Sequence, residues 1–201
     1  MKLKQYVTEH FEQSIELLKQ CKENLNDDII LAANIIVQSL MNDGKVLTCG
    51  NGGSAADAQH FSAELVGRFE QERMGLATIA LTTDSSILTA ISNDYDFDFI
   101  FSKQIFALGK KNDVLLAIST SGNSPNIIEA INAAHEKEIS IIAMTGNNGG
   151  KIAELLNAND MLLNVPHSRT ARIQEVHTLI IHAMCDCIDK MLFGENNNLS
   201  L

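Results

Sequence analysis

The sequence predicts a doubly wound α/β fold, a three-layer arrangement in which helices cover both faces of a five-stranded parallel sheet. After Gly44, short and almost wholly apolar runs alternate with stretches of helical periodicity, as expected for strands that are buried on both faces. A chain of 201 residues, 45% of them hydrophobic, can bury one sizeable core. We expect one compact unit with an N-terminal helical segment at 1–43, an α/β domain at 44–193 and a frayed tail at 194–201.

The N-terminal segment has the periodicity of a helix. Apolar residues such as Leu18, Ile29 and Ile36 recur at intervals of three and four from about residue 3 to residue 43. The polar stretch "NLNDD" is predicted to divide the segment into two helices, with Asn26 or Asp27 as a cap. The apolar faces exceed what one small sheet needs to cover it, which favours contacts between subunits. The same faces could equally be buried within one subunit.

Five apolar runs are predicted as the strands of the sheet: "KVLTCG" (45–50), "LATIALT" (76–82), "DVLLAIS" (113–119), "ISIIAMTG" (139–146) and "DMLLNVP" (160–166). Helices are predicted after Ser54, Asp84, Ser124, Lys151 and Arg169. In such folds ligands bind outside the carboxyl ends of the strands, so the loops that follow the strands are the place to look for a site.

The composition excludes several classes of function. A formal net charge of -10 and a pI near 4.9 argue against a nucleic-acid-binding surface and against a polybasic membrane contact. The sequence has neither an export signal nor an apolar run of about 18 residues, so we expect a cytoplasmic protein. The spacing of the four cysteines fits neither a disulfide framework nor a zinc ribbon, and we interpret them as core thiols: Cys21, Cys49, Cys185 and Cys187.

The loop after the first strand, "CGNGGSAADAQHF", is rich in glycine. Gly52 and Gly53 let the backbone approach a ligand closely, and Asn51 and Ser54 add polar side chains just before a helix. The spacing matches neither a Walker A motif nor the GxGxxG of dinucleotide sites. This loop alone is compatible both with a substrate cradle and with a simple glycine-rich turn.

The loop after the third strand, "STSGNSPNIIEA", gathers hydroxyl groups at a helix start. Ser124 is well placed as the N-cap, and Pro125 as the first helical residue. Free backbone N–H groups and the positive end of the helix dipole suit a phosphate without any lysine or arginine. Capping is the alternative role. The hydroxyl groups come from Ser119, Thr120, Ser121 and Ser124.

Two helices carry residues that could bind a metal ion. His60 and Glu64 are four residues apart on the first, which places two ligand side chains on one face. An isolated pair of this kind is more often an ordinary surface pair, but this one closely follows the glycine loop. On the last helix, Gln174 and His182 are about 12 Å apart along the axis, a long reach for one ion. His177 points elsewhere, so we interpret it as a packing or hydrogen-bonding residue.

Four stretches together resemble the phosphoheptose isomerases, a branch of the sugar isomerase (SIS) domain proteins. They are "CGNGGSAADAQHFSAEL", "ISND", "AISTSGNSPNI" and "RIQEVHTLIIH", and the resemblance extends to about residue 192. It implies an enzyme that converts sedoheptulose 7-phosphate into D-glycero-D-manno-heptose 7-phosphate, the first step towards ADP-heptose and the lipopolysaccharide core. It also implies a cytoplasmic homotetramer that binds one zinc ion per subunit.

The resemblance assigns roles by position. The implied zinc ligands are His60, Glu64, Gln174 and His182. The implied substrate-binding residues are Asn51, Gly52, Gly53, Ser54, Glu64, Arg68, Asn93, Asp94, Ser119, Thr120, Ser121, Ser124 and Gln174. The segment "HSRTA" departs from the pattern, because some relatives have an aspartate two or three residues before the glutamine, and an acidic group there is in doubt.

Moving a proton between C1 and C2 of a ketose through an enediol requires a base, an acid and stabilisation of an oxyanion. We assign Glu64 as the base and His182 as the acid, each able to contribute about 10²- to 10⁴-fold, with zinc as a Lewis acid. The alternative is a non-catalytic tetrameric SIS adaptor that binds the bacterial replication initiator, which "TARIQEVH" also resembles. A sugar-phosphate-sensing regulator is weakened because no DNA-binding region is attached.

Overall fold

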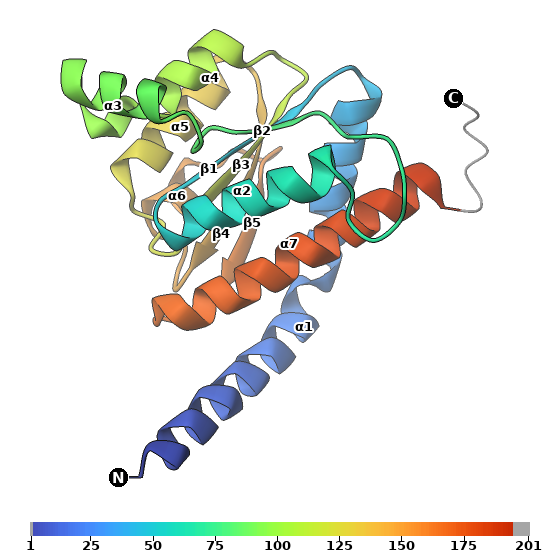
Figure 1. Ribbon diagram of the computed structural model, residues 1–201, viewed down its shortest axis with the longest axis vertical. Helices are drawn as coiled ribbons and strands as arrows, with labels where there is room; N and C mark the ends of the chain where they lie inside the picture. Colours follow the sequence, from blue (N-terminus) through green and yellow to red (C-terminus); the bar gives the residue numbers. More distant parts are fainter. Residues whose placement is uncertain (1, 195–201) are drawn as a thin grey trace.

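The computed structural model describes residues 2–194 and contains a five-stranded parallel sheet in the order β2-β1-β3-β4-β5 (Figure 1). The strands are β1 (Val46–Gly50), β2 (Thr78–Ala80), β3 (Val114–Ser119), β4 (Ser140–Gly146) and β5 (Met161–Val165). Every predicted strand is present and all pairings are parallel, so the predicted fold class is confirmed. β3 is buried at every position, which explains its unbroken apolar sequence.

Helices cover both faces of the sheet (Figure 1). One face packs against α1 (Leu3–Met41), α2 (Gly53–Val66) and α7 (Thr170–Phe193). The other packs against α4 (Ser102–Leu108), α5 (Pro125–Glu136) and α6 (Gly150–Leu155), with α3 (Ser85–Asp94) and the 3-10 turn η1 (Phe97–Phe99) at its margin. Among the described residues, no helix combines the length and hydrophobicity of a membrane span.

The N-terminal segment forms one helix of 39 residues, so the predicted break at "NLNDD" is wrong. Leu25 and Ile29 lie on either side of the polar residues and are buried on the face that packs against α7. Asn26 and Asp27 point to solvent instead of capping a new helix. The burial of one continuous apolar face therefore outweighs the weak helix propensity of Asn and Asp.

No helix or strand was predicted between α3 and β3, where the structure has η1 and α4. α4 is short, and it is anchored by Gln104, whose buried amide donates to the carbonyl oxygens of Leu81 and Ile100. Ile105 of the same helix is completely buried. A helix of seven residues is held by such tertiary contacts more than by its own periodicity. The predicted tail at 194–201 lies outside the described residues, apart from Gly194.

Candidate functional site

The loops that follow β1 and β3 lie side by side, because these strands are neighbours in the sheet and Gly50 pairs with Ile118. Asn51 and Asn126 join the loops through two reciprocal amide hydrogen bonds of 2.8 and 2.9 Å. Asn126, on the first turn of α5, is 1% exposed and was not singled out from the sequence. In the sequence, Asn126 could have been noticed only as a polar residue directly after Pro125. The pairing fixes the Asn51 side chain at the carboxyl edge of the sheet.

Hydroxyl groups line the second loop as predicted. The Ser119 and Ser124 hydroxyl oxygens lie 3.0 Å apart, and the Ser121 hydroxyl accepts a hydrogen bond from the backbone N–H of Asn123. Ser124 occupies the N-cap position with Pro125 next to it, yet its hydroxyl makes no capping bond. The Ser124 hydroxyl therefore faces Ser119 across the loop instead of satisfying the helix start.

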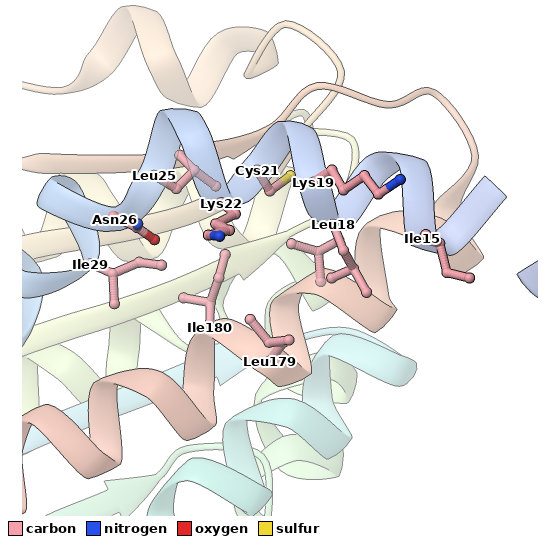
Figure 2. A pocket seen from close by; sticks show the side chains of 11 residues that line it. Ile15, Leu18, Lys19, Cys21, Lys22, Leu25, Asn26, Ile29, Leu179 and Ile180 are labelled. Atoms are coloured by element: carbon pink, nitrogen blue, oxygen red, sulfur yellow. The ribbon is translucent and has the colours of Figure 1, made fainter. Parts of the chain in front are cut away.

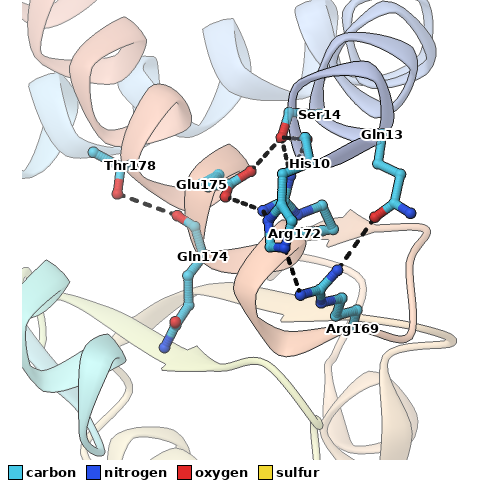
Figure 3. Close-up of polar contacts among 8 residues, drawn as sticks. All are labelled: His10, Gln13, Ser14, Arg169, Arg172, Gln174, Glu175 and Thr178. Carbon is cyan, nitrogen blue, oxygen red and sulfur yellow. Dashed lines mark hydrogen bonds and ion pairs between the residues drawn. The ribbon is translucent and has the colours of Figure 1, made fainter. Parts of the chain in front are cut away.

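α2 and α7 run in the same direction and meet along a row of polar contacts. The amide of Gln174 lies against Gly53, where a Cβ atom would come within 2.8 Å of the Gln174 Cδ. One turn further along, Thr178 donates to the Asp57 carboxylate at 3.2 Å. Figure 3 shows the Gln174 side chain pointing away from the polar contacts that join the start of α7 to α1. The absence of a side chain at Gly53 is what leaves room for the Gln174 amide.

The row ends in a cluster of three half-buried metal-ligand candidates, His60, Glu64 and His182, whose ligand atoms all lie within 4.8 Å of one another. His60 Nε2 is 3.0 Å from Glu64 Oε1 and 3.3 Å from His182 Nε2. Tetrahedral zinc with bonds of about 2.0 to 2.1 Å separates its nitrogen ligands by roughly 3.3 Å. The spacing and the donor types therefore fit zinc.

Gln174 is the fourth residue of the implied ligand set, and the structure places its amide at the other end of the row. Gly53, its neighbour, precedes His60 by seven residues, about 10 Å along α2. The described protomer thus brings three of the four predicted ligands together and keeps the fourth beside the glycine loop.

Asp57 lies between the two ends of the row and was missed in the sequence. Its Oδ2 is buried without a hydrogen-bond partner among the described residues. Burial raises the pKa of the Asp57 carboxyl, while the Thr178 hydrogen bond and the His60 charge oppose the rise. The position of Asp57 three residues before His60, on the same face of the helix, was a usable signal.

The remaining predicted residues do not all lie close to this row. Ser54 is buried in the first turn of α2. Arg68 is exposed and pairs with Glu72 at 3.5 Å. Asn93 and Asp94 are exposed at the end of α3, which lies on the other face of the sheet from α2 and α7. The described protomer does not bring Asn93 and Asp94 to the histidine cluster.

His177 is a packing and hydrogen-bonding residue, as predicted. It is completely buried, and its Nε2 lies 3.0 Å from the carbonyl oxygen of Thr145 on β4. Burial lowers the pKa of His177 to about 4. The ring is therefore neutral at physiological pH and ties α7 to the sheet behind the site.

The model of the SIS domain matches residues 9–146. The chain belongs to the SIS domain family. Among its relatives in that family, phosphoheptose isomerase from Neisseria gonorrhoeae (strain NCCP11945) is 62% identical over 190 residues, which cover 94% of this chain and 96% of the relative. The phosphoheptose isomerase from Laribacter hongkongensis (strain HLHK9) is 60% identical over 194 residues, 96% of this chain and 99% of the relative.

Solved structures agree with this SIS assignment. The structure of phosphoheptose isomerase from Neisseria gonorrhoeae superposes with a TM-score of 0.90 at 59% identity and covers 94% of this chain and 100% of that one. The phosphoheptose isomerase from Francisella tularensis gives a TM-score of 0.92 at 45% identity with the same coverage. Both likenesses extend over nearly the whole chain.

Proposed function

We propose that this SIS protein is an aldose-ketose isomerase that converts sedoheptulose 7-phosphate into D-glycero-D-manno-heptose 7-phosphate. The observation that carries the proposal is the 60 to 62% identity to phosphoheptose isomerases over nearly the full chain. The His60, Glu64 and His182 cluster supplies the acid-base chemistry that an enediol mechanism needs. The adaptor alternative is not favoured, because these relatives are named as enzymes.

In this mechanism Glu64 removes a proton from C1 and delivers it to C2, while His182 protonates the oxygen on C2 and takes up the proton of the C1 hydroxyl. Both groups belong to the same cluster, about 10 Å along α2 from the glycine loop. The hydroxyl groups of Ser119 and Ser124 and the N-terminus of α5 would hold the phosphate. A zinc ion held by His60, Glu64 and His182 would polarise the substrate carbonyl as a Lewis acid. Gln174, the fourth predicted ligand, lies beside Gly53 in the described protomer.

Glu64 has two roles in this scheme, and a carboxylate in a tight metal bond is a poor base. The Glu64 Oε1 that contacts His60 leaves the second carboxylate oxygen as the one able to reach the substrate. We propose that one oxygen of Glu64 faces the metal while the other accepts the proton, or that the carboxylate loosens from the metal during turnover.

We also propose that the protein is a cytoplasmic homotetramer. The first half of α1 carries a series of exposed apolar side chains, namely Leu3, Tyr6, Val7, Phe11 and Ile15. Between α1 and α7 is an apolar groove of about 430 Å³, which Ile15, Leu18 and Leu179 help to line (Figure 2). Exposed apolar surface that runs into an apolar groove is typical of a subunit contact. Light scattering tests this: a mass of one 22.0 kDa chain would contradict it.

The experiment that tests the activity is to incubate purified protein with sedoheptulose 7-phosphate and to follow the aldose by NMR. The assay is run on untreated protein, on protein stripped of metal, and on stripped protein supplied with zinc. We expect turnover that is lost with the metal and restored by zinc. A folded protein that shows no turnover with any divalent metal would refute the proposed isomerase activity. Undiminished turnover after the metal is removed would refute only the proposed requirement for zinc.

A further inference from the structure

The loop between α2 and β2 carries Arg73, a residue that the sequence did not single out. In Figure 1 this loop extends beside α7 before it returns to the sheet. The Arg73 side chain is only 2% exposed, although the loop is a surface connection. Its guanidinium makes five hydrogen bonds, to Asp189 Oδ1 at 2.7 Å and to the backbone carbonyl oxygens of Glu64, Leu65, Gly67 and Met74 at 2.8 to 3.2 Å.

Three of these carbonyl groups belong to the C-terminal end of α2. A helix leaves its last carbonyl groups without partners in the helix, and such ends fray. α2 ends at Val66, so the candidate base Glu64 lies in that last turn. Arg73 donates to the carbonyl oxygen of Glu64, and at Leu65 it adds a second donor to the backbone N–H of Leu76. It therefore fixes the backbone from which the Glu64 carboxylate projects.

The partner of Arg73 connects this helix end to α7. Asp189 follows His182 by seven residues, which places both on one face of α7 about 10 Å apart. The Arg73 and Asp189 side chains are 2% and 5% exposed, and Asp189 Oδ2 has no hydrogen-bond partner among the described residues. A buried pair with such an incompletely satisfied carboxylate is a weak source of stability, because desolvation offsets its attraction. The ion pair fastens the end of α2 to the helix that carries His182.

We propose that Arg73 and Asp189 form a positioning clamp that holds Glu64 and His60 of α2 at ligand distance from His182 of α7. The inference rests on the proposed metal site and adds two residues that touch neither substrate nor metal. Their role is to keep the ligand atoms of two separate helices in register. Replacing a partner of this kind typically costs about 10- to 100-fold in metal affinity or activity.

Arg73→Lys is the informative variant, because lysine keeps the charge that faces Asp189 but lacks the fork that reaches several carbonyl groups at once. We expect its zinc dissociation constant, measured by competition with a chromophoric chelator, to rise about 10- to 100-fold. Activity should fall at limiting zinc and recover at saturating zinc. A defect of general stability would not be rescued in this way.

Two control variants separate the clamp from ion pairs in general. Asp186→Asn removes an exposed pair with Lys190 on the same helix, and Lys45→Met removes the pair with buried Asp113 directly before β1 and β3 begin. We expect both controls to bind zinc as the unaltered protein does, even if Lys45→Met unfolds at a lower temperature. Asp189→Asn, which keeps the shape of the side chain, should weaken zinc binding.

Hydrogen exchange of metal-free protein gives a readout that does not depend on the proposed function. In Arg73→Lys, backbone amides in the last turn of α2 should exchange faster, while those of α5 stay unchanged. Unaltered zinc affinity and exchange in both Arg73→Lys and Asp189→Asn would overturn the clamp. If the unaltered protein neither bound zinc nor turned over substrate, the proposed function would fail, and the exchange experiment would still decide whether Arg73 holds the end of α2.

Discussion

Replacing Gly53 with alanine would test whether the Gln174 amide has to lie against the glycine loop. A Cβ atom at position 53 would lie 2.8 Å from the Gln174 Cδ and closer still to its Nε2, whereas ordinary contacts begin at 3.4 Å. The backbone at Gly53 is not left-handed, so the helix start accepts alanine without strain. The amide group would have to retreat by about 1 Å.

The cost of this change should fall on activity and not on folding. The displaced group is the end of a flexible side chain, and alanine is the better helix former, so the free energy of unfolding should change by less than about 1 kcal/mol. A misplacement of about 1 Å in a positioning group can cost on the order of 10²-fold in rate. We therefore expect kcat/KM for sedoheptulose 7-phosphate to fall by roughly that factor.

The assay combines steady-state kinetics with urea denaturation for Gly53→Ala and for the control Gln59→Ala, an exposed position on the same helix. The control should retain full activity. Activity of Gly53→Ala within a factor of about three of the unaltered protein would refute the reasoning. A large loss of stability in the variant would also refute it, because the steric conflict would then involve the fold and not the side chain.

Three further predictions concern the metal cluster and the buried histidine. Glu64→Gln should abolish turnover, measured by NMR, while gel filtration shows an unchanged oligomer; residual turnover above about 1% would exclude Glu64 as the base. Removing metal with a chelator should lower the unfolding temperature, and zinc should restore it, because a ligand bound only by the folded state stabilises that state. Burial holds the pKa of His177 near 4, below the usual 6.5, so the unfolded chain binds a proton more readily between these values. The free energy of unfolding should therefore decrease as pH falls from about 6.5 to about 4, by roughly 3 kcal/mol in total from this group. In urea titrations, His177→Gln should remove that part of the pH dependence.

The strands were predictable because β1, β3 and β4 are buried on both faces and therefore have largely apolar sequences. The two functional loops followed from strand ends and turn chemistry, which are also local signals. The continuity of α1 could not be predicted, since it depends on Leu25 and Ile29 packing against a helix far away in the sequence. The polar residues between them carry the opposite local signal.

The same contrast between local signals and contacts with distant segments applies to the candidate site. A spacing of four within one helix predicts that His60 and Glu64 meet, and they do, at 3.0 Å. The 3.3 Å approach of His182 depends on how α7 lies against α2, which is a relation between helices. Residues whose role is to set that relation, such as Arg73 and Asp189, have no pattern of their own in the sequence.

The parallel course of α2 and α7 also explains why two residues 12 Å apart on one helix can both belong to one site. Each contacts a different turn of α2, Gln174 at Gly53 and His182 at His60. On the proposed function, the metal cluster and the Gln174 amide would therefore contact different parts of one phosphorylated seven-carbon sugar. On the proposed function, replacing Gln174 with alanine should therefore raise KM for sedoheptulose 7-phosphate more than it raises the protein's dissociation constant for zinc.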